Sequence, residues 1–277
     1  MRTIIAAFVV AGIASAVLAT GVQGPTLAGG SAVAGPKPPT TALFDSAGPA
    51  STAAAHPPAA GPPLDAGRRG VRLLAEARAA CGGAAWDNLA GWHERGRVAA
   101  GGRASGTYEA WSAITGLGMA VRNEGGGAVT GYAGFDGATY WRVRPTGGVD
   151  AGSVPATVRL RARDAYLSNF GYFLPGRFPA SVFDAGAKTL GRAAFDVVAV
   201  TPRGAEGFEL WIDHASHRVA RIVIAGQVAE LSGYRIFAGV CAPTMLVQSD
   251  SNPAHTTTLN VDSVETAALP AAVFAVP

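Results

Sequence analysis

The chain has little of the residue types that build reactive or strongly charged sites. Its 277 residues include two cysteines, Cys81 and Cys241, and neither stands in a CxxC pair, which argues against zinc-finger and thioredoxin-like sites. It has no Gly-x-Ser-x-Gly elbow and no phosphate-binding loop, so common hydrolase and nucleotide-enzyme signatures are missing. The sequence therefore predicts a binding protein rather than an enzyme, with no catalytic residues, no metal site and no cofactor.

Charged residues are also scarce, at 15% of the chain, and the net charge is +3. Lysine occurs twice, at Lys37 and Lys188, and every other basic side chain is arginine. The arginines are scattered along the sequence rather than clustered, which is typical of a solvated surface. We therefore expect no nucleic-acid partner.

The N-terminus has the pattern of an export signal. Thr3 to Ala19 is almost unbroken in apolar residues and ends in small ones, which predicts a signal peptide over residues 1–24. A retained membrane anchor is the alternative, but the run is shorter and weaker than the roughly 20 strongly apolar residues that a spanning helix needs. The first cysteine lies far beyond any cleavage site, so no lipid-accepting cysteine would stand at the new N-terminus. We expect a periplasmic or secreted protein with no stable membrane span after cleavage.

Residues 25–67 are rich in Pro, Ala and Gly, a composition that cannot offset the entropy of ordering the chain. They predict a disordered tether. The remaining residues, 68–277, are enough for one domain.

The sequence predicts that this domain is mainly β. Helical spacing predicts a helix over residues 69–80, which Gly82 and Gly83 end. A second helix, over 156–170, is apolar around much of its circumference and is predicted to plug the concave side of a sheet. Short alternating segments predict strands at 91–100, 107–114, 118–124, 128–134, 139–144, 182–189, 194–201, 207–213, 218–225, 228–237, 244–249 and 256–265. The predicted fold class is α+β, a curved antiparallel half-barrel of about 11–12 strands with an N-terminal helix and an inserted plug helix.

The order of landmarks resembles a known superfamily. The landmarks are Cys81 to Asp87 after the helix, Tyr108 to Trp111, Gly134 to Gly137 before Trp141, Ala165 to Leu167, Leu210 to Asp213 and a terminal Val273 to Pro277. Together they are similar to the periplasmic outer-membrane lipoprotein-sorting (LolA/LolB-like) superfamily, most of all to uncharacterised members found N-terminal to aspartic protease domains. The resemblance implies a half-barrel whose apolar cavity accepts acyl chains. No Asp-Thr-Gly or Asp-Ser-Gly triplet is present, so the protease domain itself is missing.

Large apolar side chains dominate ligand cavities, and five residues are candidates to line one here: Trp111, Trp141, Tyr166, Leu167 and Phe170. The same residues could be ordinary core, the commoner fate of a tryptophan.

Two features of the sequence each allow two interpretations. Cys81 and Cys241 could form a disulfide in an oxidising compartment or remain two buried thiols. Asp213, His214 and His217 have the spacing of metal ligands, but they stand where a hairpin turn is expected, and turn residues explain them better.

Two functions follow as hypotheses. The first is an exported, non-enzymatic protein that binds a lipid, or the acyl chains of a lipoprotein, between the sheet and the plug helix. The second is an interaction or regulatory module whose cavity is filled by its own side chains and which works with a separately encoded protease or other envelope enzyme.

Overall fold

The structure is a computed structural model that describes residues 64–249 and 256–277. The predicted signal peptide and most of the predicted tether lie outside the described residues. Within them, no helix is both long enough and apolar enough to cross a bilayer.

The first helix, α1, spans Leu64–Ala80. It begins before Arg69, where the sequence predicted its start, and takes in the last residues of the predicted tether. Glycine at position 70 lets the helix approach the sheet closely, because a Cβ there would lie 2.8 Å from the backbone nitrogen of Asp184. The helix buries one apolar stripe against the sheet, formed by Leu73, Leu74 and Ala77.

Thirteen strands form one antiparallel sheet that does not close on itself, in the order β6-β5-β4-β3-β2-β1-β15-β14-β11-β10-β9-β8-β7. This confirms the predicted half-barrel. The first arm contains β1 (Trp92–Ala100), β2 (Arg103–Ser112), β3 (Met119–Gly125), β4 (Ala128–Phe135), β5 (Tyr140–Val143) and β6 (Val149–Gly152). The second contains β7 (Ala180–Leu190), β8 (Ala193–Pro202), β9 (Phe208–Asp213), β10 (Val219–Ile224), β11 (Gln227–Ser232) and β14 (Met245–Ser249). Strand β15 (Thr257–Glu265) lies between β1 and β14 and joins the arms.

The strand predicted over 228–237 is wrong in its second half. Strand β11 ends at Ser232 because Gly233 adopts a left-handed conformation with φ of 64°. The chain then forms a separate two-stranded sheet from β12 (Arg235–Phe237) and β13 (Val240–Ala242).

A disulfide between Cys81 and Cys241, with Cα atoms 4.6 Å apart, ties this hairpin to the end of α1. The Cys241 backbone N–H also donates to the Cys81 carbonyl at 3.1 Å. The short helix η1 (Gly83–Asn88) follows the disulfide and buries Trp86.

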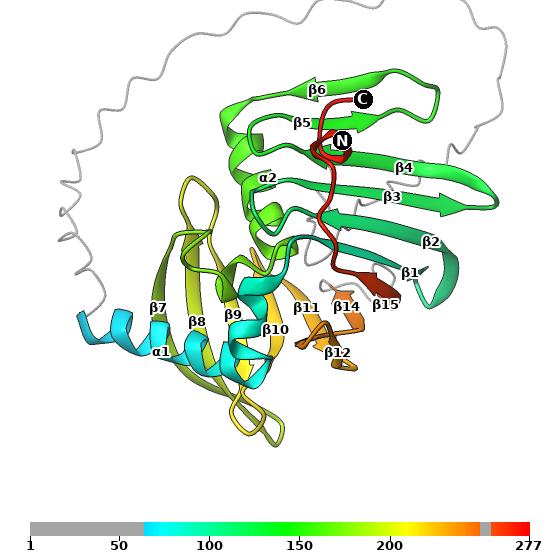
Figure 1. Cartoon of the computed structure of the whole chain (residues 1–277). Coiled ribbons are helices and arrows are strands. Elements are labelled where there is room, and N and C mark those ends of the chain that lie inside the picture. Colours follow the sequence, from blue (N-terminus) through cyan, green and yellow to red (C-terminus); the bar gives the residue numbers. More distant parts are fainter. Residues whose placement is uncertain (1–63, 250–255) are drawn as a thin grey trace, which may run out of the picture. The chain divides into compact units, whose positions relative to one another are not determined.

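Helix α2 spans Pro155–Ser168 and is buried on all sides over residues 162–168. Phe170, in the left-handed region at φ of 51°, turns the chain from α2 into the short helix η2 (Gly171–Phe173). Figure 1 shows α2 lying between β4 to β6 and the upper ends of β7 to β9. Its apolar contacts bridge the two arms, because Ala162 and Ala165 share a cluster with Phe135 of β4 and with Ala205 of the β8–β9 loop.

The C-terminal segment covers part of the opposite, outer face of the sheet. It includes the short helix η4 (Ala271–Val273) and places Phe274 against Trp141 and Ala120. The Trp141 indole N–H donates to the Phe274 carbonyl at 2.8 Å. Gly134 lies directly beneath that indole ring, where a Cβ would come within 2.4 Å of it.

Candidate functional site

The predicted cavity residues of the plug belong to the core. Tyr166, Leu167 and Phe170 are each no more than 2% exposed. The ring of Phe170 packs against Trp86 and Trp92, with centroids 5.0 Å and 5.1 Å apart. These three plug residues therefore do reach the concave face of the sheet, and they fill it.

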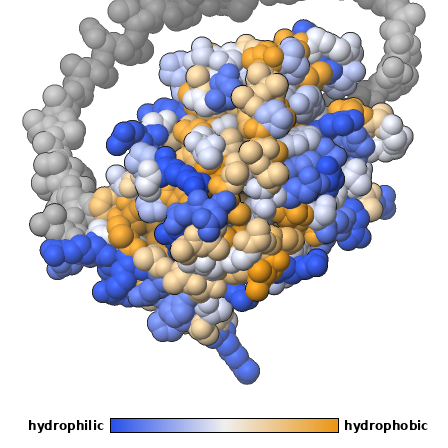
Figure 2. All heavy atoms as spheres, viewed as in Figure 1, coloured by the Kyte–Doolittle hydropathy of each residue, from blue (hydrophilic) through white to orange (hydrophobic). Residues whose placement is uncertain are grey.

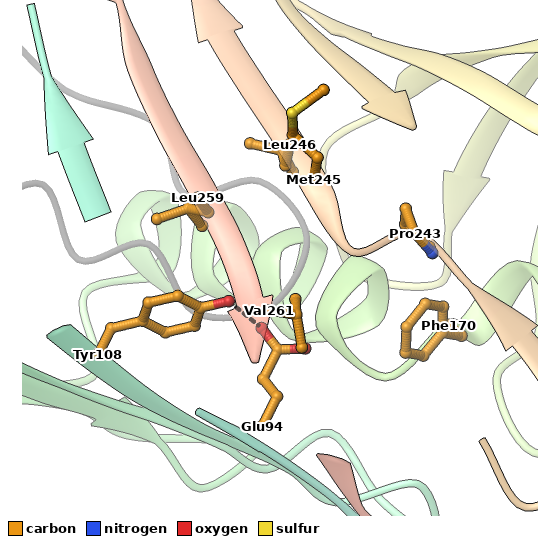
Figure 3. Close-up of a pocket in the computed structure, with 8 residues that line it drawn as sticks. All are labelled: Glu94, Tyr108, Phe170, Pro243, Met245, Leu246, Leu259 and Val261. Carbon is orange, nitrogen blue, oxygen red and sulfur yellow. Dashed lines mark hydrogen bonds between the residues drawn. The ribbon is translucent and has the colours of Figure 1, made fainter. Parts of the chain in front are cut away.

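Among the described residues, one cavity between plug and sheet is small. A cavity of about 20 Å³ remains, lined by Phe170 and by residues of β1, β2, β14, β15 and the segment between β13 and β14: Glu94, Tyr108, Pro243, Met245, Leu246, Leu259 and Val261. Figure 3 shows Tyr108 and Glu94 pointing toward one another, with Phe170 and Pro243 to the side. A cavity of this size holds about one water molecule, so an acyl chain does not fit without movement of the plug.

Glu94 is an unusual member of this lining because it is a carboxyl group buried to 2% exposure. Its two oxygens accept hydrogen bonds from the Trp92 indole N–H and the Tyr108 hydroxyl, each at 3.0 Å. Burial raises the pKa of Glu94 to about 7, although both hydrogen bonds act to lower it. The carboxyl group therefore holds its proton well above the pH at which an exposed glutamate loses it.

The two tryptophans among the cavity candidates are placed elsewhere. Trp111 lies opposite His93 in the β1–β2 ladder and stacks on its ring, whereas Tyr108 and Glu94 face the plug. Trp141 is packed beneath the C-terminal segment on the same outer face as Trp111. Side chains directly opposite one another in an antiparallel pair share a face, so Trp111 and Trp141 lie across the sheet from Tyr166, Leu167 and Phe170.

Open space lies instead beside α2, where two hollows adjoin along Pro179, Pro202 and Arg203. The smaller hollow has a volume of about 220 Å³ and an apolar lining from the β2–β3 loop, α2 and the segment before β7: Leu117, Ala162, Tyr166 and Phe178. The larger has a volume of about 440 Å³ and a more polar lining from α2, β7, the end of β8 and the β8–β9 loop, including Arg159, Ser181 and Thr201. The face of the molecule on which α1 and α2 are visible shows hydrophobic patches broken up by hydrophilic side chains (Figure 2).

Three arginines border these hollows, and each is held differently. Arg159 forms an ion pair with Glu206 at 2.9 Å. Arg177 donates to the backbone carbonyls of Asp87, Leu89 and Ile114. The side chain of Arg203 is exposed and makes no hydrogen bond or ion pair with any residue that the structure describes.

Helix α2 also carries a buried ion pair close to the hollows. Arg163 donates two hydrogen bonds to one oxygen of Asp164, at 3.1 Å and 2.7 Å, and Arg161 donates to the other at 3.2 Å. Arg163 and Asp164 are 5% and 2% exposed. The ion pair fixes polar groups inside the plug, where an unpaired charge would be costly.

The Asp213–His214–His217 segment forms the turn that the sequence favoured. One carboxylate oxygen of Asp213 accepts hydrogen bonds from the backbone and hydroxyl of Ser216, at 2.8 Å and 2.7 Å. The side chain of His214 turns away to Asp196, 3.0 Å from its carboxylate. Among the described residues, no group of three or more His, Cys, Asp or Glu side chains could hold a metal ion.

Sequence reasoning missed Glu94 and the arginines of the hollows. Glu94 had a usable signal, because it stands two residues after Trp92 and so shares its face of a strand. The arginines had none, since Arg159, Arg177 and Arg203 come from three separate segments that only the fold brings together.

Comparison with known proteins adds evidence on the fold. No family model and no curated protein matches the chain. A LolA superfamily protein from Nitrosomonas europaea has a similar structure, with a TM-score of 0.53 and 14% identity over 74% of this chain and 97% of that one. A DUF1329 family protein from Desulfovibrio piger gives a TM-score of 0.50 and 11% identity over 76% and 97% of the two chains. At these identities the likeness shows the fold alone, and that fold is the half-barrel of the LolA superfamily structure.

Proposed function

We propose that this chain is an exported, non-enzymatic protein that binds a lipid, or the acyl chain of a lipoprotein, in the apolar hollow beside α2. The observation that carries the proposal is the hollow of about 220 Å³, whose apolar lining comes from the plug helix and from both arms of the sheet. The half-barrel fold shared with a LolA superfamily protein supports it. The disulfide between Cys81 and Cys241 suits an oxidising compartment outside the cytoplasm, the periplasm or the exterior.

The energetics of such a site are those of partition from water. One water molecule takes up about 30 Å³, so the hollow has room for about seven groups of that size. Seven methylenes buried there would contribute about 6 kcal/mol before the cost of association is subtracted. Association costs about 4 kcal/mol or more, so the net affinity from this hollow alone would be weak and binding would be reversible.

A longer chain needs more room than the hollow provides. Its path would continue past Tyr166, which is part of the hollow, toward Leu167 and Phe170 between α2 and the sheet. The predicted cavity between sheet and plug would then form on binding, as Phe170 moves aside from Trp86 and Trp92.

Native mass spectrometry of the full chain, recovered without detergent from an exporting host, tests the proposal. We expect a stoichiometric adduct of lipid mass. Leu117→Asp should remove it, because a carboxylate would stand in the apolar hollow. Val129→Asp controls for the added charge: Val129 is exposed on β4, outside both hollows, and its replacement should leave the adduct in place. Leu117 also packs against the core, so an unchanged circular dichroism spectrum must show that Leu117→Asp is folded. A clean apo mass after incubation with phospholipid and acylated peptide would refute lipid binding.

The second candidate is an interaction module, and one observation favours it: the concave face is filled by the protein's own side chains, with about 20 Å³ left. On this alternative the partner would be a separately encoded protease or other envelope enzyme. A clean apo mass would select it, and co-purification of a stoichiometric protein partner from the native envelope would then be the next measurement.

A further inference from the structure

The two hollows beside α2 differ in chemistry in a way that suits the two ends of an amphiphile. The smaller hollow is lined mainly by apolar residues, among them Leu117, Ala162, Tyr166 and Phe178, and also by Arg177. The larger hollow exposes the hydroxyl-bearing residues Ser181 and Thr201, with Arg159 and Arg203 at its border. Arg203 lines both, so a guanidinium group stands where the polar and apolar parts meet.

The positive charge at this junction is not neutralised. Neither hollow has an Asp or Glu among the described residues that line it. Arg177 lines the smaller hollow only, and its guanidinium donates to backbone carbonyls. The side chain of Arg203 has no hydrogen-bond or ion-pair partner among the described residues. The junction of the two hollows therefore carries one guanidinium group, that of Arg203, without a carboxylate partner among the described residues.

The backbone around Arg203 is fixed. Its N–H donates to the Pro179 carbonyl at 3.0 Å, and the Ala205 N–H donates to the Pro202 carbonyl at 3.1 Å. Gly204 takes the left-handed conformation that this turn requires, with φ of 73°. A guanidinium presented from a fixed turn loses less entropy on binding an anion than one on a mobile loop.

We infer that the larger hollow takes the phosphate of an anionic amphiphile whose acyl chain lies in the smaller hollow, with Arg203 as the residue that selects the charge. This inference rests on the proposed function and names the class of lipid. Guanidinium groups bind phosphate oxygens in pairs of parallel hydrogen bonds, and hydroxyl groups supply further donors.

The experiment compares short-chain lipids that stay monomeric in solution. Calorimetric titration of the full chain would use dihexanoyl phosphatidylglycerol, dihexanoyl phosphatidylcholine and inorganic phosphate as probes. We expect the anionic lipid to bind about tenfold more tightly than the zwitterionic one, in proportion to one charge-assisted contact. This preference should weaken as salt is added.

Two variants assign the preference to a residue. Arg203→Gln should reduce the affinity for phosphatidylglycerol about tenfold, and should reduce it more than the affinity for phosphatidylcholine, because the choline cation offsets the charge of the phosphate in that lipid. Arg192→Gln is the matched control: both arginines are exposed, flank β8 at opposite ends and have no side-chain partner among the described residues. Neither change removes a side-chain hydrogen bond or ion pair among the described residues, and an unchanged thermal unfolding midpoint reports that the variant is folded.

The outcomes distinguish a failure of this inference from a failure of the proposed function. Equal binding of the two lipids to the wild type, or equal effects of the two variants, would overturn the anionic selection and leave lipid binding in place. Inorganic phosphate that binds as tightly as phosphatidylglycerol would also overturn it, since the site would then recognise a free anion. If neither lipid binds, the proposed function fails and the inference fails with it.

Discussion

Glu94 makes the stability of the protein depend on pH in a direction opposite to that of most carboxylates. Burial raises the pKa of this group from its ordinary value of 4.5 to about 7 in the folded protein. Below pH 4.5 both states hold the proton, and stability is complete. As pH rises toward 7 the unfolded chain releases the proton that the folded chain keeps, so the free energy of unfolding falls.

The size of the effect follows from the two pKa values. Their difference of about 2.5, at about 1.36 kcal/mol for each pKa unit, gives a loss of about 3 kcal/mol between about pH 4 and about pH 8. Glu94→Gln removes the titrating group and keeps its shape. We expect the free energy of unfolding of the variant, minus that of the wild type, to rise by this amount over the same range.

Urea unfolding followed by tryptophan fluorescence, in steps of pH, measures the difference. Other titrating groups cancel, because they are common to both proteins. Tyr108→Phe is the control: it removes the hydroxyl donor 3.0 Å from Glu94 and keeps the carboxyl group. It should lower stability by about 1 kcal/mol and leave the fall with rising pH in place. Parallel curves for wild type and Glu94→Gln would refute the reasoning, and a difference of opposite sign would mean that the carboxylate is ionised in the folded state.

Three further predictions concern the framework of the site. Replacing Cys81 and Cys241 together with Ala should cost up to about 5 kcal/mol, because the disulfide closes a separation of 160 residues; urea unfolding that is unaffected by reductant and by the substitution would contradict this. Asp164→Asn leaves Arg163 buried without a carboxylate and should cost about 3–5 kcal/mol, measured by thermal unfolding, and a cost below about 1 kcal/mol would show that the charge finds another partner. Trp141→Phe removes the hydrogen bond to the C-terminal backbone and should cost about 1 kcal/mol. Limited proteolysis should then cut the C-terminal segment sooner, and unchanged kinetics would refute that role.

The sheet was predictable in strands where apolar and polar residues alternate clearly. In β9, Phe208, Leu210 and Ile212 alternate with more polar neighbours, and the structure buries these three. The break at Gly233 was not visible as a break, because apolar residues continue on both sides of it. The left-handed backbone conformation of that one glycine ends strand β11.

The candidate site was predictable in part. The helical period showed that Tyr166, Leu167 and Phe170 belong to a segment with too few polar positions for a surface helix, and they are buried. Because side chains alternate between the two sides of a strand, Tyr108 and Trp111 were expected on opposite sides of the sheet. The alternation does not tell which of the two residues lies on the side of the plug. The hollows depend on the meeting of α2 with the β8–β9 loop, a contact between distant segments that no local pattern records.

The position of β15 has a consequence for how the domain is assembled. Strands β1 to β6 pair with their sequence neighbours, and so do β7 to β11, whereas β15 bridges β1 and β14 across the middle of the sheet. Two locally connected halves can therefore form early, but they become one sheet only when the last strand is inserted between them. A chain that ends before residue 257 would present two open strand edges, on β1 and β14, each able to pair with another molecule. Truncated chains should therefore aggregate or be degraded rather than persist as soluble half-barrels.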